Sequence, residues 1–206
     1  MEPLSAFERL AGRVYTGARD GAVDREAAFE LACLVLEEQP LDEAAAELAR
    51  LSMDSGLDDD ARLAAAAFRV LDDRFEPGFD EEPGWLAALQ EAMEAVNRDM
   101  RASGLPGTGR LVRYDWSPNA YAQSWDGETS TGGGIFPESG SDPAAALAAV
   151  ADDAQDAVMH TIWGAWPLCP VHGLGVHARE RDGAAVWWCE RAGGHVAAPI
   201  GGWRER

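Results

Sequence analysis

The sequence lacks lysine altogether and has only three cysteines, and both shortages limit what the protein can be. All 17 basic residues are arginines, a bias to which we attach no function. Three cysteines do not make an extracellular disulfide framework, so we expect reduced thiols. The sequence also has no run of eighteen apolar residues and no apolar segment near its start. It therefore predicts neither a membrane span nor an export signal, and we expect a cytoplasmic protein.

Negative charge is abundant. The 206 residues include 36 acidic and 17 basic residues, which gives a formal net charge of −19. Residues 1–104 hold 24 acidic residues and 10 arginines, net −14, whereas residues 105–206 hold 12 and 7, net −5. Such a chain repels nucleic acid. The charge either keeps helix surfaces soluble or forms a recognition surface for a basic protein partner.

The first part of the chain has a helical pattern. Alanine-rich segments with acidic N-caps predict helices over residues 24–40, 41–56 and 57–75. In the first of these, Phe29, Cys33 and Leu36 form the expected apolar face, so we predict a buried Cys33. A fourth helix is expected over residues 81–104, where apolar residues recur on one side. Residues 1–104 are thus predicted to be an acidic helical region.

The pattern changes after Gly104. The segment GLPGTG is typical of a linker, and residues 111–136 alternate aromatic and β-branched residues with turn residues, as in a small antiparallel meander. A helix follows at residue 143 with Ser141 or Asp142 as its cap, and then a β-hairpin with an Asp-Gly turn. We therefore predict an α+β fold: an N-terminal helical bundle, a small antiparallel β meander, a helix and a C-terminal zinc-ribbon-like hairpin (166–203). The expected domains are residues 1–104 and 105–206.

The C-terminal hairpin is flanked by cysteine and histidine in the spacing C-x2-H-x16-C-x5-H. The residues are Cys169, His172, Cys189 and His195. Zinc favours four such nitrogen and sulfur ligands in a tetrahedron, and four protein ligands leave no open position for catalysis. The spacing predicts one structural zinc ion per chain. Two alternatives stay open: a metal-free hairpin with buried cysteines, and His177 as a replacement for either histidine.

Other candidate sites are weaker. Asp152, Asp156 and His160 are spaced four residues apart along one helix, a pattern that we interpret as a solvated edge because a helix C-terminus favours histidine. The motifs of zinc deaminases, zinc hydrolases and serine hydrolases are absent, so no catalytic residue and no organic cofactor site is predicted. Polar residues among the aromatics of residues 111–136 are the place for a ligand pocket, although aromatics in a small sheet are usually core.

The C-terminal segments WPLCPVHG, GAAVWWC and VAAPIGGW follow a helix that carries VADDAQDAV. This combination resembles a set of uncharacterised actinobacterial proteins with a W-P-x-C-P-x-H element, a hairpin and a W-x-C element. The resemblance covers residues 143–203. Its shared elements contain Cys169, His172 and Cys189, and His195 is the loosest part of the pattern. It implies a common metal-binding end to the chain and no particular activity.

Two functional hypotheses follow from these features. The first is a non-catalytic acidic cytoplasmic binding protein, such as an immunity-type or regulatory inhibitor of a basic protein partner, with a structural zinc site. Neither nucleic acid nor a membrane is an expected partner. The alternative is a small-molecule-binding protein or unrecognised enzyme that uses the aromatic meander 111–136.

Overall fold

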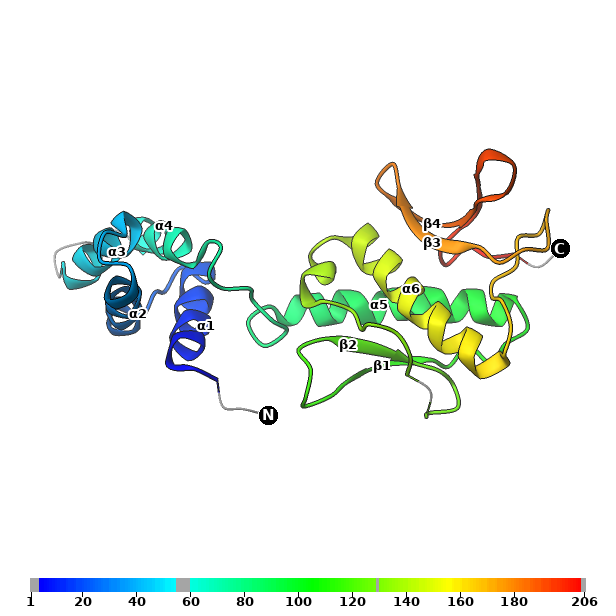
Figure 1. Ribbon diagram of the computed structural model, residues 1–206, viewed down its shortest axis with the longest axis horizontal. Coiled ribbons are helices and arrows are strands. Elements are labelled where there is room, and N and C mark those ends of the chain that lie inside the picture. Colours follow the sequence, from blue (N-terminus) through cyan, green and yellow to red (C-terminus); the bar gives the residue numbers. More distant parts are fainter. Residues whose placement is uncertain (1–3, 55–59, 129, 205–206) are drawn as a thin grey trace. The chain divides into compact units, whose positions relative to one another are not determined.

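The computed structural model describes residues 4–54, 60–128 and 130–204 and contains two compact units, Met1–Glu81 and Glu82–Arg206 (Figure 1). We call them the N-terminal unit and the C-terminal unit. The sequence predicts a boundary after Gly104, but the structure divides the chain after Glu81. The reason is that helix α5 (Pro83–Ala102) packs against α6 (Pro143–Ile162), far along the chain. The change in composition after Gly104 marks the end of a helix and not the end of a domain.

The described part of the N-terminal unit contains four helices. These are α1 (Ala6–Arg19), α2 (Arg25–Glu38), α3 (Glu43–Met53) and α4 (Asp60–Leu71). Each helix packs against the next, and α4 returns to contact α1, so the four helices enclose one core of alanine, leucine and valine. Helix α1 was not among the helices predicted from the sequence. Its signal was present, because Ser5 and Glu8 form a reciprocal capping box at the start of the helix.

Helix α2 begins at the expected residue, but the face that it buries differs from the predicted one. The Asp24 carboxylate accepts hydrogen bonds from the backbone N–H groups of Glu26 and Ala27. The buried face consists of Ala27, Ala28, Leu31, Ala32 and Val35. Alanines let neighbouring helices approach closely, and they turn the larger Phe29 outward. The prediction of a buried Cys33 is therefore wrong, since this residue is half-buried.

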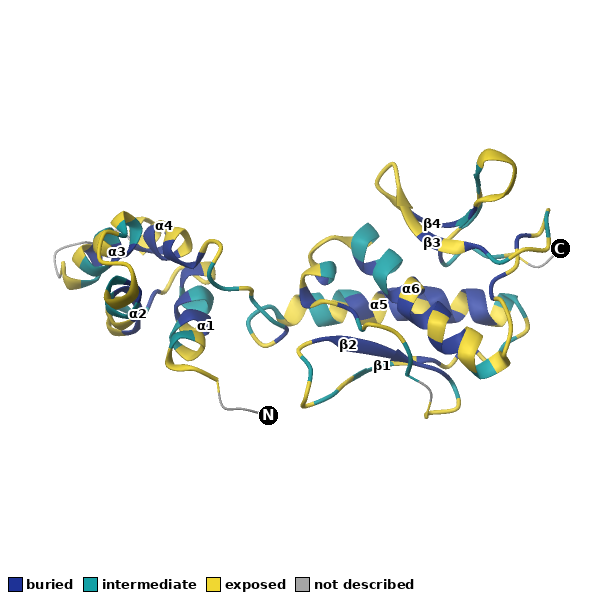
Figure 2. Cartoon of the chain, viewed as in Figure 1, coloured by how far each residue is buried: buried dark blue, intermediate teal, exposed yellow. Residues whose placement is uncertain are grey.

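The C-terminal unit has three layers, with α5 and α6 between two small sheets (Figure 1). One sheet pairs β1 (Arg110–Arg113) with β2 (Ala120–Gln123), and the other has the order β3 (His177–Arg181), β4 (Ala184–Cys189), β5 (His195–Pro199). Short 3-10 helices occur at Pro137–Ser141 and Arg191–Gly193. Within this unit, Figure 2 shows buried residues on α5, α6 and β2 and also on β4. The fold is mixed α+β, with helices first and small antiparallel sheets after them.

The strands follow the sequence pattern closely. An isolated antiparallel bridge between Ala120 and Ile135 extends the β1–β2 pair, as a small meander would. Strands β3 and β4 form the predicted hairpin, and both Asp182 and Gly183 have the positive φ that a tight hairpin turn requires. The third strand, β5, was not predicted. Within the described ranges, none of the helices combines the length and apolar character needed to cross a membrane.

Two buried polar side chains on α5 hold extended segments against the helix. Asn97 donates to the carbonyl of Gly109 and accepts from its N–H, both at 2.9 Å. Residues 104–109 are therefore packed on α5 and do not act as a linker. Asp99, fully buried, accepts hydrogen bonds from Trp187 Nε1 (2.7 Å) and from the backbone N–H groups of Gly201 (2.7 Å) and Trp203 (2.8 Å).

Two further buried side chains do the same on α6. Asp153 accepts from the N–H groups of Ala122 (2.6 Å) and Gly134 (3.1 Å), which anchors β2 and the following loop. The pKa of Asp153 is raised to about 6, mainly by burial and in smaller part by the neighbouring Asp156 and Asp152, and the two hydrogen bonds only partly oppose this rise. Gln155 donates to the carbonyls of Trp166 and Val176, both at 2.6 Å. Helix α6 thus contacts both sheets through polar groups as well as apolar ones.

We expect Asp99→Asn to destabilise the C-terminal unit by about 2 to 4 kcal/mol, because an amide nitrogen would face buried N–H donors. All eight tryptophans lie in residues 82–206, so tryptophan fluorescence during urea unfolding measures this unit specifically. Glu94→Gln, the same carboxyl-to-amide change on the exposed side of α5, is the control and should be neutral. Equal midpoints for the two variants would contradict the anchoring role of Asp99.

The raised pKa of Asp153 has a defined effect on stability. A folded-state pKa above the unfolded value adds stability that is complete below the unfolded pKa, about 3.9, and is lost as pH rises through about 6. Wild type should therefore lose stability as the pH rises from 4.5 to 7.5, whereas Asp153→Asn lacks this titration. Over that range the free energy of unfolding of Asp153→Asn should rise by about 1 to 2 kcal/mol relative to wild type, allowing for solvent screening. Fluorescence-monitored unfolding at both pH values measures this change. A stability difference that stays constant with pH would refute it.

Candidate metal centre

The first half of the site is a tight loop after α6. The Cys169 N–H donates to the Leu174 carbonyl at 2.7 Å, and the Gly173 N–H donates back to the Cys169 carbonyl at 2.8 Å. An antiparallel bridge between Leu168 and Gly175 closes the base of the loop. Gly173 has φ +65°, a left-handed conformation that glycine adopts without strain. This turn brings His172 back toward Cys169.

The second half of the site comes from two adjacent strands. Cys189 ends β4, His195 begins β5, and the two residues are direct antiparallel partners. Opposite residues of an antiparallel pair project from the same face of the sheet. The connecting loop needs glycine at position 194, where φ is +86° and a Cβ atom would lie 2.2 Å from the Trp188 ring. The register of β4 and β5 therefore places the second cysteine and histidine together.

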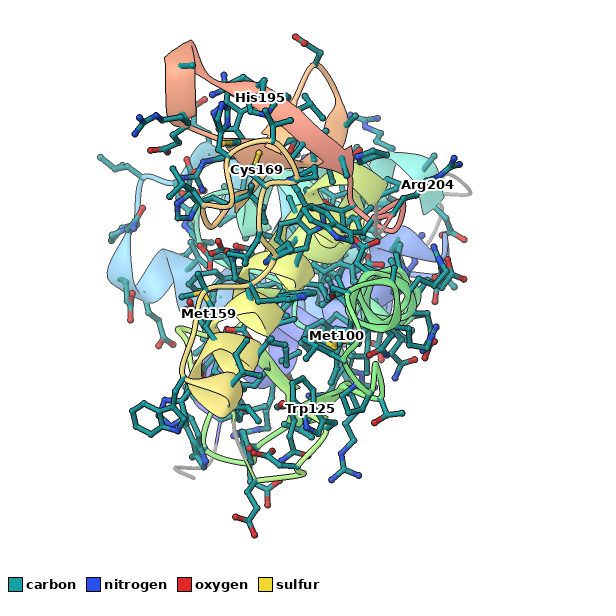
Figure 3. All side chains as sticks on the ribbon, turned by 90° about the vertical axis from the view of Figure 1, so that its right-hand side faces the viewer. Met100, Trp125, Met159, Cys169, His195 and Arg204 are labelled. Atoms are coloured by element: carbon teal, nitrogen blue, oxygen red, sulfur yellow. The ribbon has the colours of Figure 1, made fainter. Side chains whose placement is uncertain are left out.

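Helices α5 and α6 hold the two halves in place. Gln155 on α6 binds the carbonyls of Trp166 and Val176, which lie on either side of the first loop. Asp99 on α5 binds the Trp187 indole on β4. The Trp166 and Trp187 rings pack edge to face with centroids 5.4 Å apart. Figure 3 shows Cys169 and His195 close together at one end of the unit, far from Trp125.

The four predicted side chains converge on one point. Their donor atoms all lie within 4.8 Å of one another, so Cys169, His172, Cys189 and His195 are close enough to bind a metal ion. Cys169 Sγ is 3.6 Å from His172 Nδ1 and 3.5 Å from His195 Nε2. Cys189 Sγ is 3.4 Å from His172 Nδ1. Both cysteines are 1% exposed, and both histidines are half-buried.

The environment of Cys169 favours the thiolate, which is the form that binds metals. Burial raises the pKa of the Cys169 thiol, but hydrogen bonds from the backbone N–H groups of Val171 and His172, and from the Cys189 side chain, outweigh burial. The pKa of Cys169 therefore lies below its ordinary value. The tight loop supplies ligand geometry and negative charge together.

The remaining sequence candidates do not join this centre. Within the described residues, the Cys/His group is the single cluster of three or more potential ligands. His177 is exposed on β3, and Asp152, Asp156 and His160 are exposed on α6, where the His160 ring contacts Trp163. The interpretation of that helix edge as solvated agrees with this exposure.

The aromatic residues of segment 111–136 form a cluster of their own. Tyr114 stacks on Trp116 with centroids 5.3 Å apart, and both rings contact Tyr121. Beside them the Asn119 side-chain oxygen is buried without a hydrogen-bond partner. Sequence reasoning singled out these residues for their chemistry but could not show that the three rings meet.

No protein-family model matches the chain, and comparisons with curated proteins and with solved structures give no match. The resemblance inferred from the sequence therefore stays a prediction. The case for a metal centre rests on the geometry of the four side chains.

We expect the purified protein to contain about one divalent metal ion per chain, and Cys169→Ser or Cys189→Ser to lose it, because serine is a poor ligand for a borderline-soft ion. Elemental analysis measures the metal content. Cys33→Ser is the matched control, since this cysteine lies on α2 in the N-terminal unit. Equal metal content in all three variants, or no metal in wild type expressed with metal available, would contradict the site.

Proposed function

We propose that the chain is a non-catalytic binding protein whose acidic N-terminal unit recognises a basic protein partner and whose C-terminal unit is held together by a structural zinc ion. The negative charge of the N-terminal unit is the observation that supports the binding role. The cluster of four potential ligands supports the structural role of the metal.

Zinc accounts for the distances in the cluster. A tetrahedron with zinc–sulfur bonds of about 2.3 Å and zinc–nitrogen bonds of about 2.0 Å has sulfur–nitrogen edges of roughly 3.5 Å. Three of the four sulfur–nitrogen distances are 3.4, 3.5 and 3.6 Å, and all donor atoms lie within 4.8 Å of one another. His172 Nδ1 lies near both sulfurs, whereas a ring nitrogen makes only one well-directed hydrogen bond. A central ion satisfies all these contacts at once and supports a zinc-ribbon-like arrangement.

The number of ligands favours a structural ion over a catalytic one. A catalytic zinc keeps one position for water or substrate, whereas four protein ligands close the coordination shell. Two thiolates also neutralise the charge of the ion. The metal would join the Cys169 loop to strands β4 and β5, and so stabilise a part of the unit that has only short strands.

The N-terminal unit is strongly acidic and has few uncompensated cations. Residues 1–81 contain 20 acidic residues and 8 arginines, net −12. Arginines paired with an acidic side chain of the same unit are Arg13, Arg19, Arg25, Arg69 and Arg74. Such pairs leave an excess of exposed carboxylates, which speeds association with a basic protein and disfavours acidic ones.

The aromatic cluster supports the alternative of a small-molecule-binding protein less well. The unpartnered Asn119 oxygen is an acceptor that a ligand could use. However, this oxygen is buried from solvent, and the Asn119 amide nitrogen already lies 3.4 Å from the Gly133 carbonyl. A ligand would have to displace the loop to reach it. The binding-protein proposal requires no such rearrangement.

The binding role predicts a partner of opposite charge. A protein captured from source cells with the full chain and then purified should be basic, and its association rate should fall at least ~10-fold from 0.01 M to 0.15 M salt. Changing Glu30, Glu37, Glu38 and Glu43 to glutamine should lower the rate several-fold further, because these exposed acids lie on α2 and α3.

The matched control changes four exposed acids of the C-terminal unit, Glu91, Glu94, Glu128 and Glu138, to glutamine. Stopped-flow kinetics compares the two quadruple variants with wild type. The acidic recognition surface is ruled out if the association rate changes neither with salt nor with the N-terminal substitutions. It is also ruled out if the control variant lowers the rate by the same factor.

A further inference from the structure

A hollow of about 370 Å³ lies in the N-terminal unit, between α1 and the end of α4. Its size falls at the lower end of the range for small-ligand sites. The lining residues are Tyr15, Phe68, Arg69, Leu71, Asp72 and Phe75. We call this hollow the aromatic notch. It is separate from the metal centre and from the aromatic cluster of the C-terminal unit.

Three aromatic rings form the wall of the notch. Tyr15 on α1 packs edge to face with Phe68 on α4, with centroids 5.7 Å apart, and lies 5.8 Å from Phe75 at a tilt of 52°. Phe68 is 40% exposed, so its ring reaches solvent. Rings set at different angles present electron-rich faces in several directions. Such faces attract a cation that has lost part of its hydration.

The charges around the notch also favour a cation. Asp72 is exposed at the rim and directly follows the last residue of α4, where the helix dipole has its negative end. Arg69 is the one basic residue in the lining, and its guanidinium binds the Glu47 carboxylate at 2.6 Å. Its charge is thus largely compensated. The notch combines aromatic faces, a free rim carboxylate and a negatively charged unit.

We propose that the aromatic notch binds an arginine side chain of the basic partner, with the guanidinium against Phe68 and Tyr15 and paired with Asp72. A planar guanidinium stacks on aromatic rings and matches a carboxylate in bidentate geometry, which an ammonium group does not. This inference rests on the proposed function and adds to it the residue type recognised and the place of contact.

The test is an NMR titration of the full-length, isotope-labelled protein with N-acetyl-arginine amide. Shifts should be confined to the residues around the notch, with millimolar affinity. N-acetyl-citrulline amide has nearly the same shape without the charge, and it should bind at least about 5-fold more weakly. Equal binding of the two compounds, or shifts centred elsewhere, would overturn the proposal. Tighter binding of N-acetyl-lysine amide would overturn the choice of arginine.

Two variants locate the interaction. Asp72→Asn should weaken binding of the arginine amide at least about 3-fold, whereas Asp73→Asn should leave it unchanged. Asp73 is exposed, does not line the notch and has φ +58°, a conformation that asparagine tolerates well, so it is a matched control. Phe68→Leu keeps an apolar side chain but removes the ring, and it should reduce the preference for arginine over citrulline, while Tyr15 and Asp72 retain part of it. Identical behaviour of the two asparagine variants would refute the role of Asp72.

Failure of this inference can be told apart from failure of the proposed function. If the captured partner responds to salt and to the α2–α3 substitutions but binds Asp72→Asn and Phe68→Leu like wild type, the notch proposal is wrong and the acidic surface stands. If the arginine amide binds the notch but no partner depends on the acidic residues, the function is wrong and the notch stands.

Discussion

The carboxylate of Asp99 is the contact on which the C-terminal unit depends most. It is fully buried on α5 and receives hydrogen bonds from the Trp187 indole on β4 and from the backbone at Gly201 and Trp203. Burial raises the pKa of this carboxyl, which records the cost of removing it from water. Three hydrogen bonds, which join the helix to a strand and to residues 201–203, offset part of that cost.

The same principle recurs across the unit. Asn97, Asp153 and Gln155 are buried polar side chains that bind backbone groups of extended segments. Small sheets of two or three short strands cannot bury enough apolar surface to fix their position alone. Polar contacts with defined geometry supply the missing specificity, because an unmade hydrogen bond to a buried group is expensive. The same contacts position the Cys/His cluster, since Gln155 binds the carbonyls on either side of the Cys169 loop and Asp99 binds Trp187 on the strand of Cys189.

The two units differ in the side chains that form their cores. The N-terminal unit packs four helices around alanine and leucine and has no tryptophan, whereas the C-terminal unit contains all eight tryptophans and the Cys/His cluster. A self-sufficient helical core leaves the surface free to vary in charge. That separation is consistent with our proposal that the N-terminal unit carries recognition and that zinc stabilises the C-terminal unit.

Local patterns in the sequence predicted the helix caps at Asp24 and Asp42, a cap at Ser141 or Asp142, the apolar stripe of α5, the Asp-Gly hairpin and the four Cys/His side chains of the candidate metal centre. These features depend on neighbours within a few residues, or on donor chemistry and spacing that only a few sites share. The capping box of α1 was equally local and could have been found. Tertiary structure alone decided that α5 belongs with the C-terminal unit, that Cys33 is half-buried, and that β5 pairs with β4 in the register that sets His195 opposite Cys189. Helix rotation, strand partners and the roles of Asp99 and Asp153 depend on residues distant in the chain, whose approach is set by packing rather than by local sequence.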